Sequence, residues 1–250
     1  MDKQIQIGKI KILICQDKEE VARVAADIFA QSIRKKPDIV LGLATGGTPV
    51  GMYQELIRTH RDEGLDFSQV KSFNLDEYLG LGGDHNQSYR YFMNENLFDH
   101  VNIDKSNTRV PDGKAADLQS SCKKYEDDIK AAGGIGLQLL GIGSNGHIAF
   151  NEPGSAGGSR TRVVNLTERT IKDNARFFKD ESEIPRQAVT MGIGTILEAR
   201  KIVLLATGSN KADAVARAVK GKVSPDLPVS FLQKHPGCTF IVDREAAGEL

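Results

Sequence analysis

Short apolar runs alternate along this chain with segments in which apolar residues recur at helical spacing. Ile10 to Cys15 is the first apolar run, and Val21, Val24, Ala25 and Ile28 then follow the spacing of one helix face. The same order predicts further strands at 38–43, 70–74, 136–140, 201–206 and 240–243, and helices after Pro49 and at 88–96, 115–132, 167–178 and 210–220. Strands that alternate with helices imply crossover connections. We therefore expect an α/β fold with a mostly parallel, Rossmann-like open sheet and helices on both faces, in three layers.

Four of these strands run directly into turns rich in Gly, Thr, Ser, Asn and Asp. These segments are 41–48, 73–77, 139–147 and 204–211. The carboxyl ends of parallel strands lie along one edge of a sheet, where ligands bind in open α/β folds. We therefore expect the four turns to surround one crevice.

Length and charge limit the kinds of partner. The chain has 250 residues with no evident linker or internal repeat, so we expect a single domain spanning 1–250. Its 33 basic and 33 acidic residues cancel, which leaves no long-range field to attract nucleic acid or an anionic membrane. We expect a small molecule as the ligand.

The cysteines indicate a reducing compartment. Cys15, Cys122 and Cys238 are an odd number and far apart, which argues against a disulfide framework and a cysteine-based zinc site. The first fifteen residues lack the apolar run of a secretory signal, and no later run approaches a membrane span. We expect a soluble, cytoplasmic protein.

Two of the turns have the composition of an anion site. Thr45, Gly46, Gly47 and Thr48 lie between a strand and a helix, where glycines permit close backbone approach and helix amides attract a phosphate. Lys211 follows a similar turn and supplies a cation. The alternative for the first turn is a tight bend without a ligand, and for Lys211 a solvated surface position. The spacing matches neither a P-loop nor a dinucleotide site, and the near match at 141–146 is not followed by a helix opening.

The other two turns carry groups suited to proton transfer. Asp76 comes just after a strand, where a partly desolvated carboxylate is a good base, although Asp76 or Glu77 could instead cap a helix. His147 lies in a glycine-rich turn with Glu152 five residues on, so the carboxylate could orient the imidazole. The alternative is a structural histidine. The spacing does not resemble that of a helical zinc site, so no metal is expected.

These residues lie in segments that resemble the glucosamine-6-phosphate deaminase family, and the likeness covers nearly the whole chain. The matching segments, in family order, are LATGGTP (43–49), FNLDEYLGL (73–81), SYRYFMNENLF (88–98), GIGSNGHIAFNEPGS (141–155), SRTR (159–162) and GSNKADAV (208–215). The related phosphogluconolactonases have a similar glycine-histidine turn, but Asp76-Glu77-Tyr78 and the run from Phe150 to Pro153 resemble the deaminases. The resemblance implies conversion of glucosamine 6-phosphate and water to fructose 6-phosphate and ammonia, in amino-sugar catabolism and without a cofactor.

The resemblance also implies roles for individual residues. Asp76 matches the base that moves the C2 proton, His147 the acid/base of sugar ring opening, and Glu152 its charged partner. Asn145 matches a position beside them that is aspartate in many members, which leaves open whether it acts by charge or by orienting a hydrogen bond. The phosphate-binding positions of the family fall on Thr45, Gly46, Gly47, Thr48, Arg176 and Lys211. Arg176, on the expected helix 167–178, could form a bidentate contact or lie on the surface.

Some family members are allosteric hexamers and others are unregulated monomers. This chain is similar to the second kind, because Arg162-Val163-Val164-Asn165 stands where regulated members resemble Arg-x-Lys-Thr. We therefore favour a monomer, with a homo-oligomer as the alternative. Two other functions stay open on the same fold: a sugar-phosphate lactonase, which would use water attack, and a non-catalytic sugar-phosphate sensor, which would not need Asp76, His147 and Glu152 together.

Overall fold

The computed structural model describes residues 3–168, 171 and 184–250. Its strands are β1 (Lys3–Ile7), β2 (Ile10–Cys15), β3 (Val40–Leu43), β4 (Lys71–Asn74), β5 (Asp76–Tyr78), β6 (Thr108–Arg109), β7 (Leu137–Leu140), β8 (Arg162–Asn165), β9 (Gln187–Thr190), β10 (Ile202–Ala206) and β11 (Cys238–Asp243). Its helices are α1 (Lys18–Lys35), α2 (Gly47–Glu63), α3 (Tyr89–Asn96), α4 (Leu118–Ala131), α6 (Ile193–Leu197) and α7 (Ala212–Lys220), with short 3-10 helices η1 (Phe98–His100), η2 (Lys105–Asn107), η4 (Ser209–Lys211) and η5 (Pro228–Lys234).

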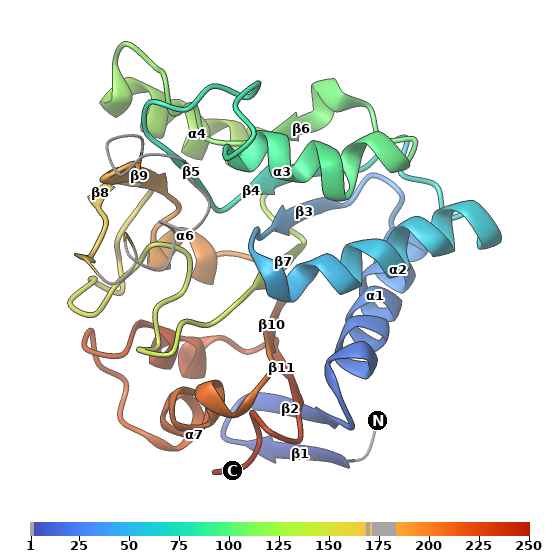
Figure 1. The fold of residues 1–250 in the computed structure, drawn as a ribbon, viewed down its shortest axis with the longest axis vertical. Coiled ribbons are helices and arrows are strands. Elements are labelled where there is room, and N and C mark those ends of the chain that lie inside the picture. Colours follow the sequence, from blue (N-terminus) through green and yellow to red (C-terminus); the bar gives the residue numbers. More distant parts are fainter. Residues whose placement is uncertain (1–2, 169–170, 172–183) are drawn as a thin grey trace.

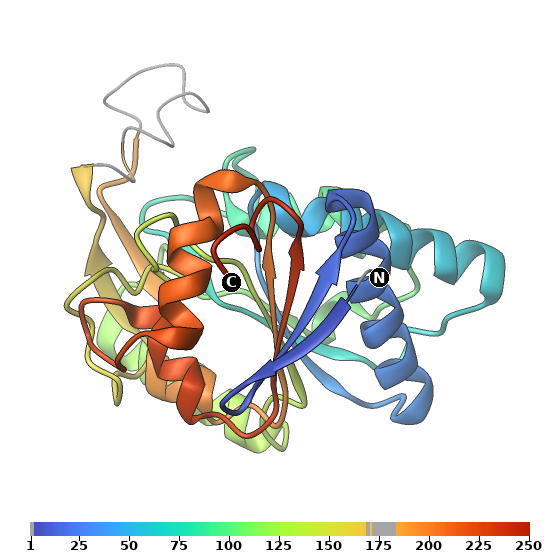
Figure 2. The same cartoon turned by 90° about the horizontal axis from the view of Figure 1, so that it is seen from below.

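The main sheet has the strand order β1-β2-β11-β10-β7-β3-β4-β6. The pair β1-β2 is antiparallel, and every other pair of neighbours in this order is parallel. Figure 2 shows α1 and α2 on one side of the sheet and α7 on the other. The α/β class, the mostly parallel sheet and the layered arrangement are confirmed (Figure 1).

The first helix illustrates how local sequence sets an element. Asp17 accepts a hydrogen bond from the backbone N–H of Glu20 at 2.8 Å, and Glu20 accepts one from the N–H of Gln16 at 2.7 Å. These two bonds satisfy N–H groups that the helix itself leaves unpaired. The face that α1 buries consists of apolar residues at helical spacing: Val21, Ala22, Ala25, Ala26, Phe29, Ala30 and Ile33.

The expected elements of the main sheet and its helices correspond closely to the observed ones. Ser88 caps α3 as predicted, because its hydroxyl accepts from the Tyr91 N–H at 3.0 Å. The helix expected at 210–220 begins with the 3-10 turn η4. Most of the helix expected at 167–178 lies outside the described residues. The two edge strands, β1 and β6, were not predicted: β1 buries none of its residues, and β6 has only two residues.

A second, three-stranded antiparallel sheet, β5-β9-β8, was also not predicted. Asp76 is therefore the first residue of a strand instead of part of a turn, and it pairs with Thr190 of β9. Leu75 joins the two sheets: its N–H donates to Leu43 of the main sheet at 3.0 Å, and its carbonyl accepts from Met191, just after β9, at 2.7 Å. The sheet brings together residues more than a hundred positions apart, which local periodicity cannot reveal.

The middle of the main sheet depends on one glycine. Gly42 of β3 pairs with Gln138 of β7, which is fully buried and donates to the Leu139 carbonyl at 2.8 Å. A Cβ added to Gly42 would lie 2.1 Å from Oε1 of Gln138. Glycine is therefore required here by close packing.

We predict that Gly42→Ala lowers the free energy of unfolding by about 1–3 kcal/mol, because the Gln138 side chain has to move within a packed sheet. Thermal unfolding followed by circular dichroism measures this loss. Gly158→Ala is the matched control, since a Cβ there meets no atom within 4 Å. Adding Gln138→Ala to Gly42→Ala should recover part of the loss, and equal melting temperatures for Gly42→Ala and the unchanged protein would contradict the prediction.

Candidate active site

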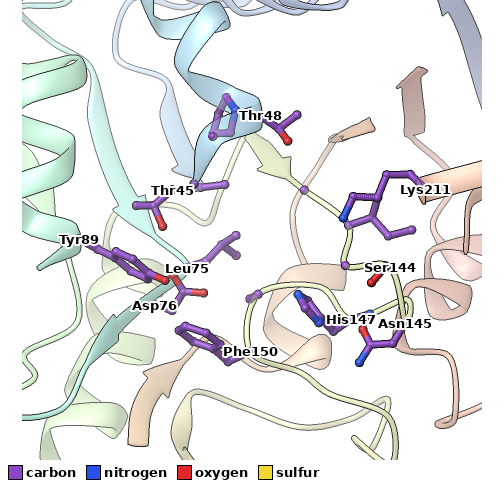
Figure 3. A pocket seen from close by; sticks show the side chains of 18 residues that line it. Thr45, Thr48, Leu75, Asp76, Tyr89, Ser144, Asn145, His147, Phe150 and Lys211 are labelled. Atoms are coloured by element: carbon purple, nitrogen blue, oxygen red, sulfur yellow. Dashed lines mark hydrogen bonds between the residues drawn. The ribbon is translucent and has the colours of Figure 1, made fainter. Parts of the chain in front are cut away.

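A cavity of about 310 Å³ opens at the carboxyl ends of the central strands. Its lining comes from segments far apart in sequence: residues 44–49 after β3, Leu75 and Asp76 after β4, Tyr89 of α3, residues 141–145, 147, 149 and 150 after β7, and Lys211 after β10. The four strand-ending segments singled out in the sequence therefore do surround one cavity. Figure 3 shows Asp76 on one side of it and His147 on the other.

The first glycine turn presents the start of α2 to the cavity. Gly46, the N-cap residue, has a φ of 96°, in the left-handed region that favours glycine, and its helix has no side-chain cap. The first amides of α2 and the hydroxyls of Thr45 and Thr48 thus lie at the cavity wall. A helix start with such exposed donors attracts an anion.

The second glycine turn lies after β10 and is fixed by a buried carboxylate. Gly208 has a φ of 88°, and its N–H donates to both carboxylate oxygens of Asp243, at 3.1 and 2.9 Å. The turn then enters η4, whose last residue is Lys211. Lys211 lines the cavity, and its amine points into it between the first turn and His147 (Figure 3).

Asp76 and Glu77 have different surroundings although they are adjacent. Asp76 lines the cavity and is only 6% exposed, and burial, followed by the charge of Glu77, raises the pKa of its carboxyl to about 8. Glu77 does not line the cavity and accepts the N–H groups of Tyr89 and Arg90 at 2.9 and 3.0 Å. Glu77 therefore binds the first two amides of α3, beside the N-cap Ser88, and Asp76 is the carboxyl group available to a ligand.

His147, Glu152 and Asn145 form a connected group on the opposite wall. Nδ1 of His147 lies 3.5 Å from a carboxylate oxygen of Glu152, which is within ion-pair distance but is not a hydrogen bond. The Asn145 side chain donates to the other carboxylate oxygen of Glu152 at 2.7 Å and accepts from the backbone N–H of His147 at 3.2 Å. Glu152 itself lies behind the cavity wall. Asn145 thus orients both partners through hydrogen bonds.

Close packing fixes the histidine ring. A Cβ on Gly143 would lie 2.4 Å from the imidazole, so this position has to be glycine. The Gly143 N–H donates to the His147 carbonyl at 2.9 Å, which closes the turn. Two residues later Ala149 has a φ of 51°, a conformation that non-glycine residues rarely adopt. This backbone turn directs Phe150 into the cavity wall.

An aromatic part of the wall was missed by the sequence reasoning. Tyr89 and Phe150 line the cavity, and their rings are stacked with 6.1 Å between centroids and an angle of 10°. The Tyr89 hydroxyl donates to that of Tyr78 at 3.1 Å. The predicted cap at Ser88 was a usable signal for Tyr89, since it places this residue at the first position of a helix near the sheet edge. Ser144 and Leu75 also line the cavity.

Arg176, the remaining residue expected at the site, lies outside the described residues. Within the described part of the chain, no group of three or more His, Cys, Asp or Glu side chains is arranged to hold a metal ion. Over the same residues, no helix has the length and apolar character needed to cross a membrane.

Comparison with known proteins identifies the family of the chain. The family of glucosamine-6-phosphate isomerases and 6-phosphogluconolactonases matches residues 16–241. A glucosamine-6-phosphate deaminase of Shewanella woodyi is 56% identical over 96% of this chain and 91% of its own, and one of Thermoanaerobacter pseudethanolicus is 52% identical over 95% and 94%.

Solved structures give the same result at the level of the fold. A structure described as a monomeric glucosamine-6-phosphate deaminase is 47% identical, covers 96% of this chain and 99% of its own, and superposes with a TM-score of 0.93. A 6-phosphogluconolactonase from Trypanosoma cruzi, 23% identical over 98% of both chains with a TM-score of 0.77, shares the fold. The resemblance found in the sequence is confirmed, and the chain belongs to the glucosamine-6-phosphate isomerase and 6-phosphogluconolactonase family.

Proposed function

We propose that this protein is a glucosamine-6-phosphate deaminase, which converts D-glucosamine 6-phosphate and water to D-fructose 6-phosphate and ammonia in amino-sugar catabolism. The observation that carries the proposal is the position of Asp76, a buried carboxyl of raised pKa, across the cavity from His147 and Glu152. Two relatives that are 52% and 56% identical over nearly the whole chain are named glucosamine-6-phosphate deaminases. A sensor would not need these three residues together.

The two glycine turns hold the substrate phosphate in this proposal. The amides at Gly46 and Gly47, the hydroxyls of Thr45 and Thr48, and the amine of Lys211 belong to residues that line the same cavity. Arg176 is added on the strength of the family resemblance. Binding energy at the phosphate, remote from the reacting carbons, fixes the sugar against the catalytic groups.

His147 opens the sugar ring. Its Nδ1 faces Glu152, so Nε2 is the nitrogen that exchanges protons, taking the proton of the C1 hydroxyl and returning one to the ring oxygen. The Glu152 carboxylate stabilises the protonated imidazole between these transfers. In this proposal Asn145, which stands where many family members have aspartate, acts by orienting Glu152, and its hydrogen bond to that carboxylate supports this role.

Asp76 carries out the carbon chemistry. In the open-chain aldehyde it removes the proton from C2, the C1–C2 double bond of an enolamine forms, and the carbonyl oxygen takes up a proton. A proton then returns to C1, which gives an imine at C2, and water replaces nitrogen to yield the ketone and ammonia. A carboxyl of raised pKa is a stronger base than an ordinary aspartate once ionised.

Further parts of the proposal concern the protein as a whole. We propose a single catalytic domain over residues 1–250, acting in the cytoplasm. A monomer is supported by the 47% identical relative, which is described as monomeric. Lactone hydrolysis is the alternative activity, because 6-phosphogluconolactonases share the fold, at 23% identity in the case of the Trypanosoma cruzi protein.

The function is tested by measuring ammonia and fructose 6-phosphate released from glucosamine 6-phosphate, beside hydrolysis of 6-phosphogluconolactone. We expect equal amounts of ammonia and fructose 6-phosphate, and lactonase activity no greater than that of a sample without enzyme. Galactosamine 6-phosphate serves as the second substrate, since discrimination at one hydroxyl depends on pocket geometry. Lactone hydrolysis without ammonia release would overturn the proposal.

We predict opposite effects of Asp76→Asn on activity and stability. Turnover should fall by about two to four orders of magnitude, because the amide cannot accept the C2 proton. The folded carboxyl holds its proton up to a pKa of about 8, whereas the unfolded one loses it near 3.8, so the carboxyl costs stability increasingly as the pH rises between these values.

Asp76→Asn removes this cost. The variant should therefore melt several degrees above the unchanged protein at pH 8, with the difference shrinking as the pH falls toward 4. Melting scans across this pH range, with ammonia release measured on the same preparations, check both effects. Near-normal turnover would exclude Asp76 as the base, and a melting temperature that is lower at pH 8 would contradict its burial cost.

We predict that Lys211→Met raises KM for glucosamine 6-phosphate at least tenfold, because the phosphate loses a cation, while kcat falls less. Steady-state kinetics of ammonia release measure both constants. Lys222→Met, which changes an exposed lysine away from the cavity, is the matched control. An unchanged KM would remove Lys211 from the phosphate site.

A further inference from the structure

Glu77 is a buried carboxylate in contact with the backbone of three residues. It is 3% exposed, and one of its oxygens accepts the N–H groups of Tyr78 and Tyr89, both at 2.9 Å. The other oxygen accepts the N–H of Arg90 at 3.0 Å. Burial raises the pKa of Glu77 to about 7, against three N–H donors and the positive end of the α3 dipole, which favour its ionised form. Glu77 therefore ionises before Asp76, whose pKa is raised to about 8.

These contacts fix the beginning of α3 relative to Asp76. Tyr89 and Arg90 are the first two residues of α3, and the third amide is held by the Ser88 hydroxyl at 3.0 Å. Because Glu77 directly follows Asp76 in β5, the same short strand carries the cavity carboxyl and the cap of the helix. Figure 3 shows the Tyr89 hydroxyl pointing toward Asp76. The position of this phenol thus depends on Glu77.

The charged and titratable groups around β5 do not cancel the Glu77 charge at Asp76. Tyr78 of the same strand, Tyr89 of α3 and Tyr125 of α4 are buried phenols whose pKa values burial raises, so they are neutral. The paired residue of β9 is Thr190, which is uncharged. Across the cavity stand His147 and Lys211.

Arg90 of α3 is the nearby cation, but its side chain is directed elsewhere. Its guanidinium donates to the hydroxyl and carbonyl of Thr108 at 2.7 and 3.0 Å and lies 5.8 Å from the centre of the Phe98 ring. Glu77 is therefore the group whose charge acts on Asp76, and once Glu77 is ionised this like charge at a neighbouring buried site favours the protonated acid.

We propose that Glu77 is a positioning residue of the active site: it holds α3, and with it Tyr89, against the cavity, and its charge makes Asp76 a stronger base. This inference rests on the proposed function in taking Asp76 as the base. Glu77 itself does not contact the substrate, because its carboxylate is occupied by the helix amides. A structural cap alone would not require a charge, and this difference can be measured.

The experiment compares Glu77→Gln, Glu77→Asp and Ser88→Ala by the pH dependence of kcat/KM for ammonia release. Glu77→Gln keeps the size and removes the charge, so the acid limb should move down by about one pH unit. Glu77→Asp keeps the charge and shortens the reach, so the limb should stay near its original pH while kcat/KM falls. Ser88→Ala weakens the same helix start without a charge change. It should lower the melting temperature and leave the limb in place.

The ionisations of the substrate are common to all variants and cancel in the comparison. A Glu77→Gln profile that superimposes on that of the unchanged protein, or an equal shift in Ser88→Ala, would overturn the proposal.

A second measurement does not use activity. The carboxyl carbon of Asp76, followed by 13C NMR and assigned with Asp76→Asn, should titrate at lower pH in Glu77→Gln than in the unchanged protein. If no variant and no wild-type sample releases ammonia, the proposed function fails, and this titration still decides whether Glu77 raises the proton affinity of Asp76. An unmoved titration would overturn the coupling, whatever the reaction.

Discussion

Parallel pairing of β3 with β4 and β7, and of β7 with β10, is the constraint from which the site follows. It forces the carboxyl ends of four strands to one edge, so four short turns meet although they are separated by up to about 160 residues in sequence. Strand pairing holds the backbone, Gly46 and Gly208 adopt the positive φ angles of their turns, and Gly143 leaves room for the His147 ring. The side chains of the turns then need only short distances to reach one ligand.

The titratable groups on the two walls of the cavity, Asp76 and His147, have different surroundings. Asp76 has aromatic and aliphatic neighbours and little water, which favours the neutral acid. His147 is one third exposed, and its Nδ1 lies 3.5 Å from the Glu152 carboxylate. The two groups thus differ in their exposure to solvent.

Periodicity predicted the six inner strands of the main sheet, β2, β11, β10, β7, β3 and β4, because they belong to apolar segments that alternate with helical patterns. Ser88 was recognisable as a cap from its position before a helical pattern, and the structure confirms it. Asp76 was expected in a turn, since a three-residue strand has no periodicity of its own and β5 exists only through pairing with β9. Tyr89 was missed for a related reason: its place in the cavity depends on the bonds between Glu77 and α3, which join residues twelve and thirteen apart. The choice between Asp76 and Glu77 likewise required knowing which face of β5 each occupies.

Leu75 connects β4 of the main sheet to β5 of the small sheet. The two glycine turns, at Gly46 and Gly208, and Asp76 therefore belong to different sheets. The turns belong to the large sheet, whereas Asp76 belongs to the small sheet. In the proposed function, the distance from the phosphate to the base is therefore set by how the two sheets pack, and we expect substitutions under the small sheet to alter it without touching either group. In the proposed function, the spacing between the two sheets thus selects substrates by the distance between their phosphorus and the reacting carbon.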